Sequence, residues 1–109
     1  MIDQQIKARC KDRLITVARA RDTISYGELA SSVGVANQSV GIYLDAIYEE
    51  ETAVGNPDFT VVVVYSGTEM GRFNSRGAPV RSVPVDPGNP DHVKAYRAER
   101  ERVYDHWAP

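Results

Sequence analysis

Residues 23–41, TISYGELASSVGVANQSVG, decide the fold expected for this chain. Ser25 and Glu28 have the spacing of a capping box, in which the Ser25 hydroxyl accepts from the Glu28 N–H and the Glu28 carboxylate accepts from the Ser25 N–H. Gly34 is typical of the left-handed residue that follows the end of a helix. The stretch therefore predicts a short helix, a tight turn and a second helix, which is helix-turn-helix spacing.

The second helix of this pair is expected to run from about Gln38 to Val54, with Asn37 as its N-cap. Gly55 and Asn56-Pro57 would end it. Its buried stripe follows helical spacing and consists of Val40, Leu44, Ile47 and Val54.

An earlier helix is predicted between Asp3 and Arg21, because apolar residues repeat there at helical spacing. Cys10 lies on that apolar stripe, so we interpret it as a small buried hydrophobe and not as a reactive thiol. Five basic residues on the same segment form the densest cationic group of the chain and are interpreted as a solvated face: Lys7, Arg9, Lys11, Arg13 and Arg19.

Downstream of the helix pair, the run from Phe59 to Tyr65 is typical of a buried strand. Gly67 to Gly71 would make a turn, and Arg72 to Asn74 would begin a return strand. A hairpin that follows a helix-turn-helix indicates a winged helix. Arg72, Arg76 and Arg81 would place three cations on or beside the wing, where they could meet a phosphate backbone or pair with the acidic helix.

Asn89-Pro90 predicts the start of a last helix, because Asn is a good cap and Pro suits the first helical position. We expect this helix to dock on the core or on a second copy of the protein. The fold class is thus α+β, a winged helix with an added C-terminal helix. Residues 1–109 would form one domain, with the helix-turn-helix and wing in 1–87 and the last helix in 88–109.

Composition fits a soluble globular protein, with 42% hydrophobic and 26% charged residues in 109. The net charge of −2 argues against a strongly basic nucleic-acid coat. One cysteine excludes an internal disulfide, which fits a reducing compartment. Because the sequence has no long apolar span, we expect no membrane segment and a cytoplasmic location.

Charge is distributed unevenly, since the window from Asp22 to Gly71 contains eight carboxylates and no Lys, Arg or His. Within it, the turn residues Asn37, Gln38 and Ser39 suit a DNA groove, because Asn and Gln can pair with adenine. The later part of the same helix would be repelled by a duplex, since it carries an acidic face made of Asp45, Glu49, Glu50 and Glu51.

An ordered set of short motifs resembles the DNA-binding domain of O6-alkylguanine-DNA alkyltransferases and alkyltransferase-like proteins. The set covers roughly residues 23–73 and consists of Thr23 to Ala30, Val33-Gly34, Ser39-Val40-Gly41, Asn56-Pro57, Gly67, Gly71 and Phe73. The resemblance implies a winged helix in which Tyr26 abuts a DNA phosphate and the third helix enters the minor groove.

Two departures from that family bear on function. Val62 to Tyr65 stand where the family has its Pro-Cys-His-Arg or Pro-Trp-His-Arg motif, so the chain lacks the thiolate needed for alkyl transfer. Gln38 aligns with the family's arginine finger, so base flipping is not expected. His92 and His106 are too far apart on one helix to share a metal. We therefore expect no catalysis, no cofactor and no metal.

Two hypotheses remain. In the first, a non-catalytic, regulatory or alkyltransferase-like protein binds double-stranded DNA weakly and with strong salt sensitivity, and dimerisation through a terminal helix restores avidity. Its DNA-binding residues are Tyr26, Asn37, Gln38, Ser39, Arg72 and Arg76. In the second, the acidic face binds a basic protein, as a nucleic-acid mimic in a regulator or phage-type inhibitor would.

Overall fold

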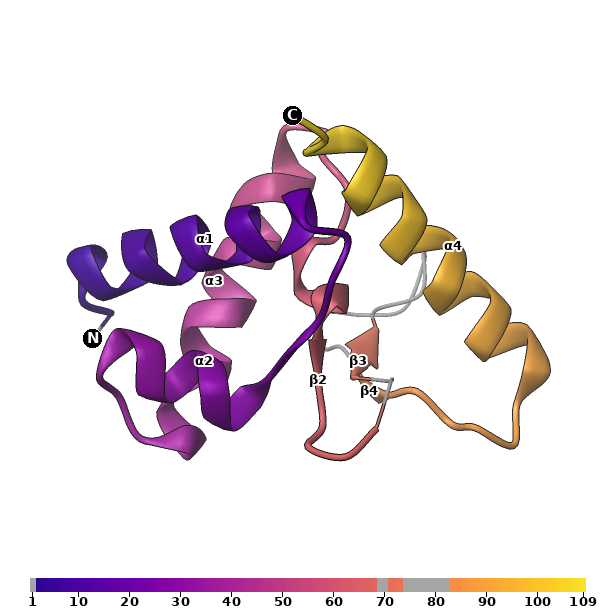
Figure 1. The fold of residues 1–109 in the computed structure, drawn as a ribbon, viewed down its shortest axis with the longest axis horizontal. Coiled ribbons are helices and arrows are strands. Elements are labelled where there is room, and N and C mark those ends of the chain that lie inside the picture. The colour runs from indigo at the N-terminus through magenta and orange to yellow at the C-terminus, as the bar shows by residue number, and fades with distance from the viewer. Residues whose placement is uncertain (1, 69–70, 74–82) are drawn as a thin grey trace.

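Four helices and two pairs of short strands make up the described part of this computed structural model, which is residues 2–68, 71–73 and 83–109 (Figure 1). The helices are α1 (Gln4–Arg19), α2 (Tyr26–Val33), α3 (Val40–Ala53) and α4 (Pro90–His106). The strands are β1 (Ile24–Ser25), β2 (Val63–Val64), β3 (Arg72–Phe73) and β4 (Val83–Pro84). Two 3-10 segments, η1 (Asn37–Ser39) and η2 (Phe59–Val62), complete a small, mostly helical α+β fold.

Helix α1 confirms the first predicted helix. The Asp3 carboxylate caps it by accepting from the Gln5 N–H at 2.9 Å. Its buried residues are Cys10, Leu14, Val17 and Ala18. Cys10 is fully buried, and that burial raises the pKa of its thiol. Because burial disfavours the reactive thiolate, the structure supports the interpretation of Cys10 as a core residue.

Helix α2 begins and ends where the sequence predicts. The Glu28 N–H donates to the Ser25 hydroxyl at 3.1 Å. The Glu28 carboxylate accepts from that hydroxyl at 3.2 Å, whereas the prediction placed it on the Ser25 N–H. Gly34 has a φ of 80°, in the left-handed region that glycine tolerates without strain. Local chemistry therefore sets both ends of this helix.

The helix α3 ends close to Val54 as predicted, but its start and the burial of Val54 correct the prediction. Asn37 is not its N-cap, because residues 37–39 form η1 and neither η1 nor α3 has a side-chain cap. The Asn37 amide lies instead against the first turn of α2, near Gly27. Val54 was placed on the buried stripe, but it lies at the helix end and is 72% exposed. Tyr43 and Glu51 are buried on this helix as well.

The predicted strand from Phe59 to Tyr65 is mostly wrong. Phe59–Val62 forms η2, because the Asp58 carboxylate accepts from the Thr60 N–H at 3.0 Å and from its hydroxyl at 2.7 Å, which holds a turn. Only Val63–Val64 is a strand, and it pairs in parallel with β1. The expected burial is confirmed, since every residue of η2 and β2 is buried.

The predicted hairpin is also corrected. Arg72–Phe73 is a strand as expected, but it pairs antiparallel with β4 and meets β2 only through a Val64–Gly71 bridge. Asn74 lies outside the described residues. The approach at Gly71 is so close that a Cβ there would overlap the carbonyl oxygen of Val63. Glycine at this position therefore lets the chain cross beside β2.

Helix α4 docks on the protein's own core, which was one of the two expected outcomes. Asn89 caps it by accepting from the His92 N–H at 3.1 Å, and Pro90 occupies the first turn, as predicted. The buried Tyr96 hydroxyl donates to the Val61 carbonyl, and Trp107 stacks on Phe59 with centroids 4.8 Å apart.

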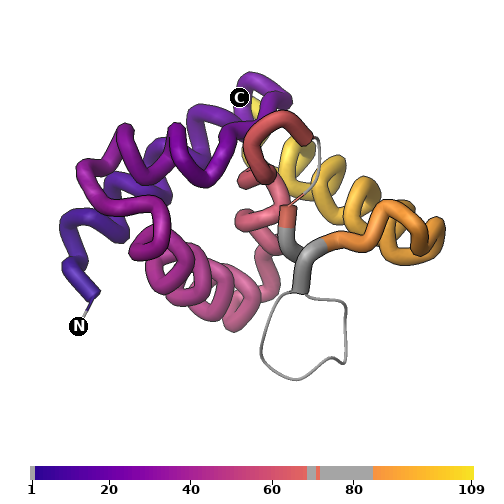
Figure 2. The backbone as a smooth tube through the Cα atoms, turned by 90° about the horizontal axis from the view of Figure 1, so that it is seen from below, coloured from indigo at the N-terminus to yellow at the C-terminus, as the bar shows by residue number. Residues whose placement is uncertain are grey.

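The buried η2–β2 segment lies between the two helical parts of the molecule. Figures 1 and 2 show α1, α2 and α3 grouped on one side of it and α4 on the other. Helix α1 contacts both α2 and α3. No helix in the described ranges is both long and apolar enough to cross a membrane. The grouping of α1, α2 and α3 leaves the turn between α2 and α3 at the surface.

Candidate nucleic-acid interface

The turn residues and the start of α2 form one surface, which we call the polar edge: Tyr26, Asn37, Gln38 and Ser39. Tyr26 is the first residue of α2, directly after its cap. A Cβ on Gly27 would lie 3.6 Å from the Asn37 amide nitrogen, so Asn37 is held beside that first turn. Gln38 is exposed and Ser39 is half-buried. The structure therefore places Asn37 beside the start of α2, next to Tyr26 in the chain, and Gln38 and Ser39 follow Asn37 in η1.

The polar edge gains positive potential from the backbone. The first N–H groups of a helix have no partner within it, and the helix dipole adds partial positive charge at that end. The start of α2 and the start of η1–α3 both lie at this edge, and the latter has no side-chain cap. An anion would thus be favoured here although the polar edge has no cationic side chain.

An aromatic pair borders the polar edge. The rings of Tyr26 and Tyr65 are 5.2 Å apart and inclined at 32°, and Tyr65 remains 37% exposed. Sequence reasoning missed Tyr65 as a surface residue because it ends a run of four valines and was counted with the buried strand. The following Ser66-Gly67 was the available signal that the chain had reached the surface.

Of the three arginines of the predicted wing, only Arg72 lies within the described residues. Arg72 is placed by its backbone, in β3. Arg76 and Arg81 lie outside the described residues. The candidate interface therefore rests on the polar edge and on Tyr65.

The predicted acidic face is only partly a surface. Glu51 is 4% exposed, accepts from the Asn56 amide at 3.1 Å and lies 3.3 Å from the Lys11 ammonium. It faces the core side because it falls one turn after Ile47 on the buried side of α3. The expectation that Glu51 belongs to an exposed interface is thus corrected.

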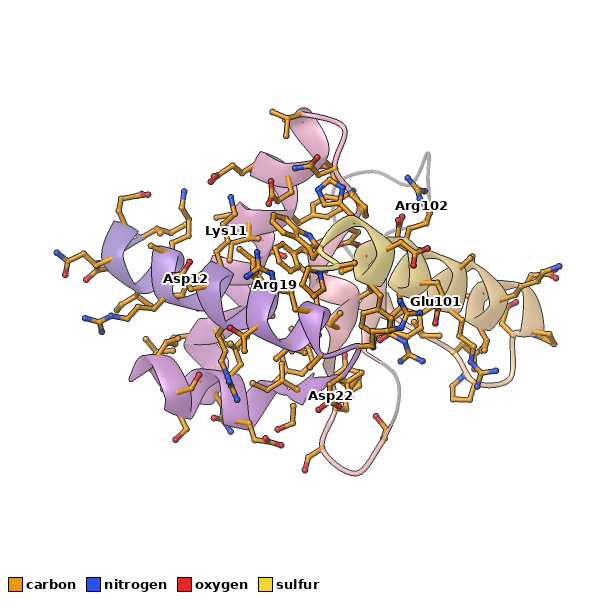
Figure 3. The ribbon with its side chains drawn as sticks, turned by 45° about the horizontal axis from the view of Figure 1, so that its top comes forward. Lys11, Asp12, Arg19, Asp22, Glu101 and Arg102 are labelled. Carbon is orange, nitrogen blue, oxygen red and sulfur yellow. The ribbon has the colours of Figure 1, made fainter. Side chains whose placement is uncertain are left out.

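Glu50 is exposed but already has partners. Its carboxylate lies 2.7 Å from Lys7 and 3.7 Å from Lys11, both of α1. The hydrogen bond from Lys7, helped by the charges of both lysines, lowers the pKa of Glu50. Figure 3 shows Lys11 on the side of α1 that is turned toward α3. Two of the four predicted acids are therefore engaged in binding α1 to α3.

The other two acids remain on an exposed strip. Asp45 and Glu49 are exposed and make no ion pair within the described ranges. Ile42, one turn earlier on the same side of α3, is 49% exposed. We call Ile42, Asp45 and Glu49 the acidic ridge.

Side chains suited to metal binding are not gathered in the part of the chain that the structure describes. No group of three or more His, Cys, Asp or Glu residues there could hold a metal ion. His92 and His106 lie near opposite ends of α4.

Comparison of this chain with protein-family models, with curated proteins and with solved structures finds no match.

Proposed function

We propose that this chain is a non-catalytic DNA-binding protein of the winged-helix type, in which the polar edge meets a duplex and the β3–β4 pair belongs to the wing. The observation that carries the proposal is the placement of Asn37 against the first turn of α2. It gathers two helix starts, three uncharged polar side chains and Tyr26 on one surface. Such a surface can donate to phosphates through backbone N–H groups and to base edges through amides.

The salt bridges between α1 and α3 reduce the negative charge of α3 that would repel DNA. Glu51 is buried and Glu50 is paired with lysines, so the acids of α3 that are both exposed and unpaired among the described residues reduce to Asp45 and Glu49. Repulsion of a duplex is weaker than the sequence implies. The polar edge has no cationic side chain of its own, so binding to a duplex is expected to be weak and sensitive to salt.

Fluorescence anisotropy with a labelled mixed-sequence duplex at low salt tests the polar edge. The double variant Asn37→Ala, Gln38→Ala is expected to weaken binding about tenfold or more, since a good bidentate base contact contributes about 1 to 3 kcal/mol. The matched control is Gln4→Ala, Gln5→Ala, which removes two exposed amides from the first turn of α1. No binding by the wild-type protein, or equal losses in both variants, would contradict the proposal.

A second candidate function rests on the acidic ridge. An exposed isoleucine beside two unpaired carboxylates suits a partner protein that has a basic, partly apolar surface. The double variant Asp45→Asn, Glu49→Gln separates the two functions. It should strengthen duplex binding if DNA is the partner and abolish complex formation if a basic protein is. Glu50 and Glu51 are left unchanged because they hold α1 against α3.

A further inference from the structure

Four of the five cations of α1 divide between two sides of the helix. Lys7 and Lys11 face α3 and pair with its glutamates. Arg9 and Arg13 are exposed and make no ion pair with any described residue. They are one helical turn apart, so their side chains lie on the same side of α1. The two arginines are therefore available to an external anion.

These arginines line an open groove of about 300 Å³ between α1 and α2, which we call the arginine groove: Arg9, Asp12, Arg13, Thr16, Ser32 and Val33. The Thr16 hydroxyl donates to the Asp12 carbonyl at 3.1 Å, and the Ser32 hydroxyl donates to the Leu29 carbonyl at 2.8 Å. Because both hydroxyl protons are used, the two guanidinium groups are the donors that this groove offers. Each can bind two phosphate oxygens at once.

We propose that the arginine groove binds the phosphodiester backbone of the duplex whose base edges meet the polar edge; this inference rests on the proposed function. One wall of the groove is the end of α2, and the chain runs from there through Gly34 to Asn37. The two sites flank α2, because Asn37 lies against Gly27 whereas Ser32 lines the groove, and these two helix positions are about 140° apart around the axis. A helix with its side chains is about 10–12 Å across, close to the width of the DNA major groove, about 12 Å. A duplex that crosses the exposed side of α2 would thus present base edges to the polar edge and phosphates to Arg9 and Arg13.

Asp12 gives the proposal a second, opposite prediction. Asp12 lines the groove, and its carboxylate pairs with no cation in the described part of the chain. A phosphate bound by the arginines would be repelled by this charge. Asp12→Asn should therefore strengthen duplex binding, whereas loss of the arginines weakens it.

The experiment measures duplex affinity between 50 and 200 mM salt for the wild-type protein and for Arg9→Gln, Arg13→Gln. Each lost phosphate contact lowers the slope of log affinity against log salt by about 0.9, so the double variant should lose about 1.8 from the slope. The wild-type advantage should then shrink about tenfold across this range. The matched control is Lys94→Gln, Arg97→Gln, which removes two exposed cations from α4 and should leave the slope unchanged.

Each outcome supports or overturns a defined statement. A lower slope for the Arg9, Arg13 variant alone, with tighter binding by Asp12→Asn, supports the groove. An unchanged slope in a protein that still binds duplex overturns the groove and leaves the polar edge standing. Equal slope losses in the control variant also overturn it, because net charge would then explain the effect. No duplex binding by the wild-type protein overturns both the groove and the proposed function.

Discussion

One helix, α1, carries two sets of cations with different roles. On the side toward α3, Lys7 and Lys11 are joined to Glu50 and to the buried Glu51. On the side toward α2, Arg9 and Arg13 border an open groove and have no ion-pair partner among the described residues. The lysine side stabilises the fold, and the arginine side is free to bind.

This difference shows why a charge count misjudges the molecule. The acidic window and the basic helix look like two opposed surfaces in the sequence, but half of the predicted acids meet lysines across the α1–α3 contact. The exposed charges without an ion-pair partner in the described residues include a smaller acidic ridge on α3 and a separate pair of arginines on α1. Availability, and not the sum of charges, decides which partner such a surface can bind.

The largest expected effect on stability comes from removing Glu51, the buried carboxylate of α3 that pairs with Lys11. Glu51→Ala would leave the Asn56 amide without its acceptor and Lys11 without its nearest anion. We expect a loss of about 1 to 3 kcal/mol in the free energy of unfolding, measured by urea denaturation. Glu49→Ala, an exposed glutamate of the same helix, is the control and should change it by less than about 0.5 kcal/mol. Equal effects would contradict the distinction between buried and exposed acids.

Removal of each cation pair in turn tests the comparison between the lysine side and the arginine side of α1. Lys7→Gln, Lys11→Gln and Arg9→Gln, Arg13→Gln remove the same charge from the same helix. The lysine variant should lower the free energy of unfolding by about 1 to 2 kcal/mol, since it leaves buried Glu51 uncompensated. The arginine variant should change it by less than about 0.5 kcal/mol. Thermal denaturation of both proteins gives the order, and the reverse order would contradict the comparison.

Sequence reasoning succeeded where the structure is determined by neighbouring residues. The capped start of α2 at Ser25, its glycine end at Gly34 and the Asn89-Pro90 start of α4 all follow from local chemistry, and all three are confirmed. The apolar stripe of α1 was found for the same reason, since helical spacing is a short-range pattern.

Sequence reasoning failed where contacts between residues far apart in the chain determine the local structure. The run of valines indicates a strand by composition, but the Asp58 turn and the pairing of β2 with β1 restrict the strand to two residues. Glu51 looked like its neighbours Glu49 and Glu50. Its place one turn after Ile47 puts it on the buried side of α3, but its lysine partner is supplied by the approach of α1. The polar edge was predicted by residue type, whereas the nearness of Asn37 to Gly27 and of Tyr65 to Tyr26 required the folded chain.

The smallest predicted effect is the pH dependence of the lysine side. Hydrogen bonding from Lys7 holds the pKa of Glu50 below its usual value, about 4.3 in an unfolded chain. A group whose folded pKa is lowered contributes stability that is present above the unfolded pKa and lost as the pH falls through the folded pKa. Glu50 is 47% exposed, so solvent screening limits this contribution to less than about 1 kcal/mol. Glu50→Gln should therefore reduce the loss of stability on acidification below about pH 4.3, measured by urea denaturation at several pH values. A wild-type loss that persists unchanged in this variant would assign the acid sensitivity to other carboxylates.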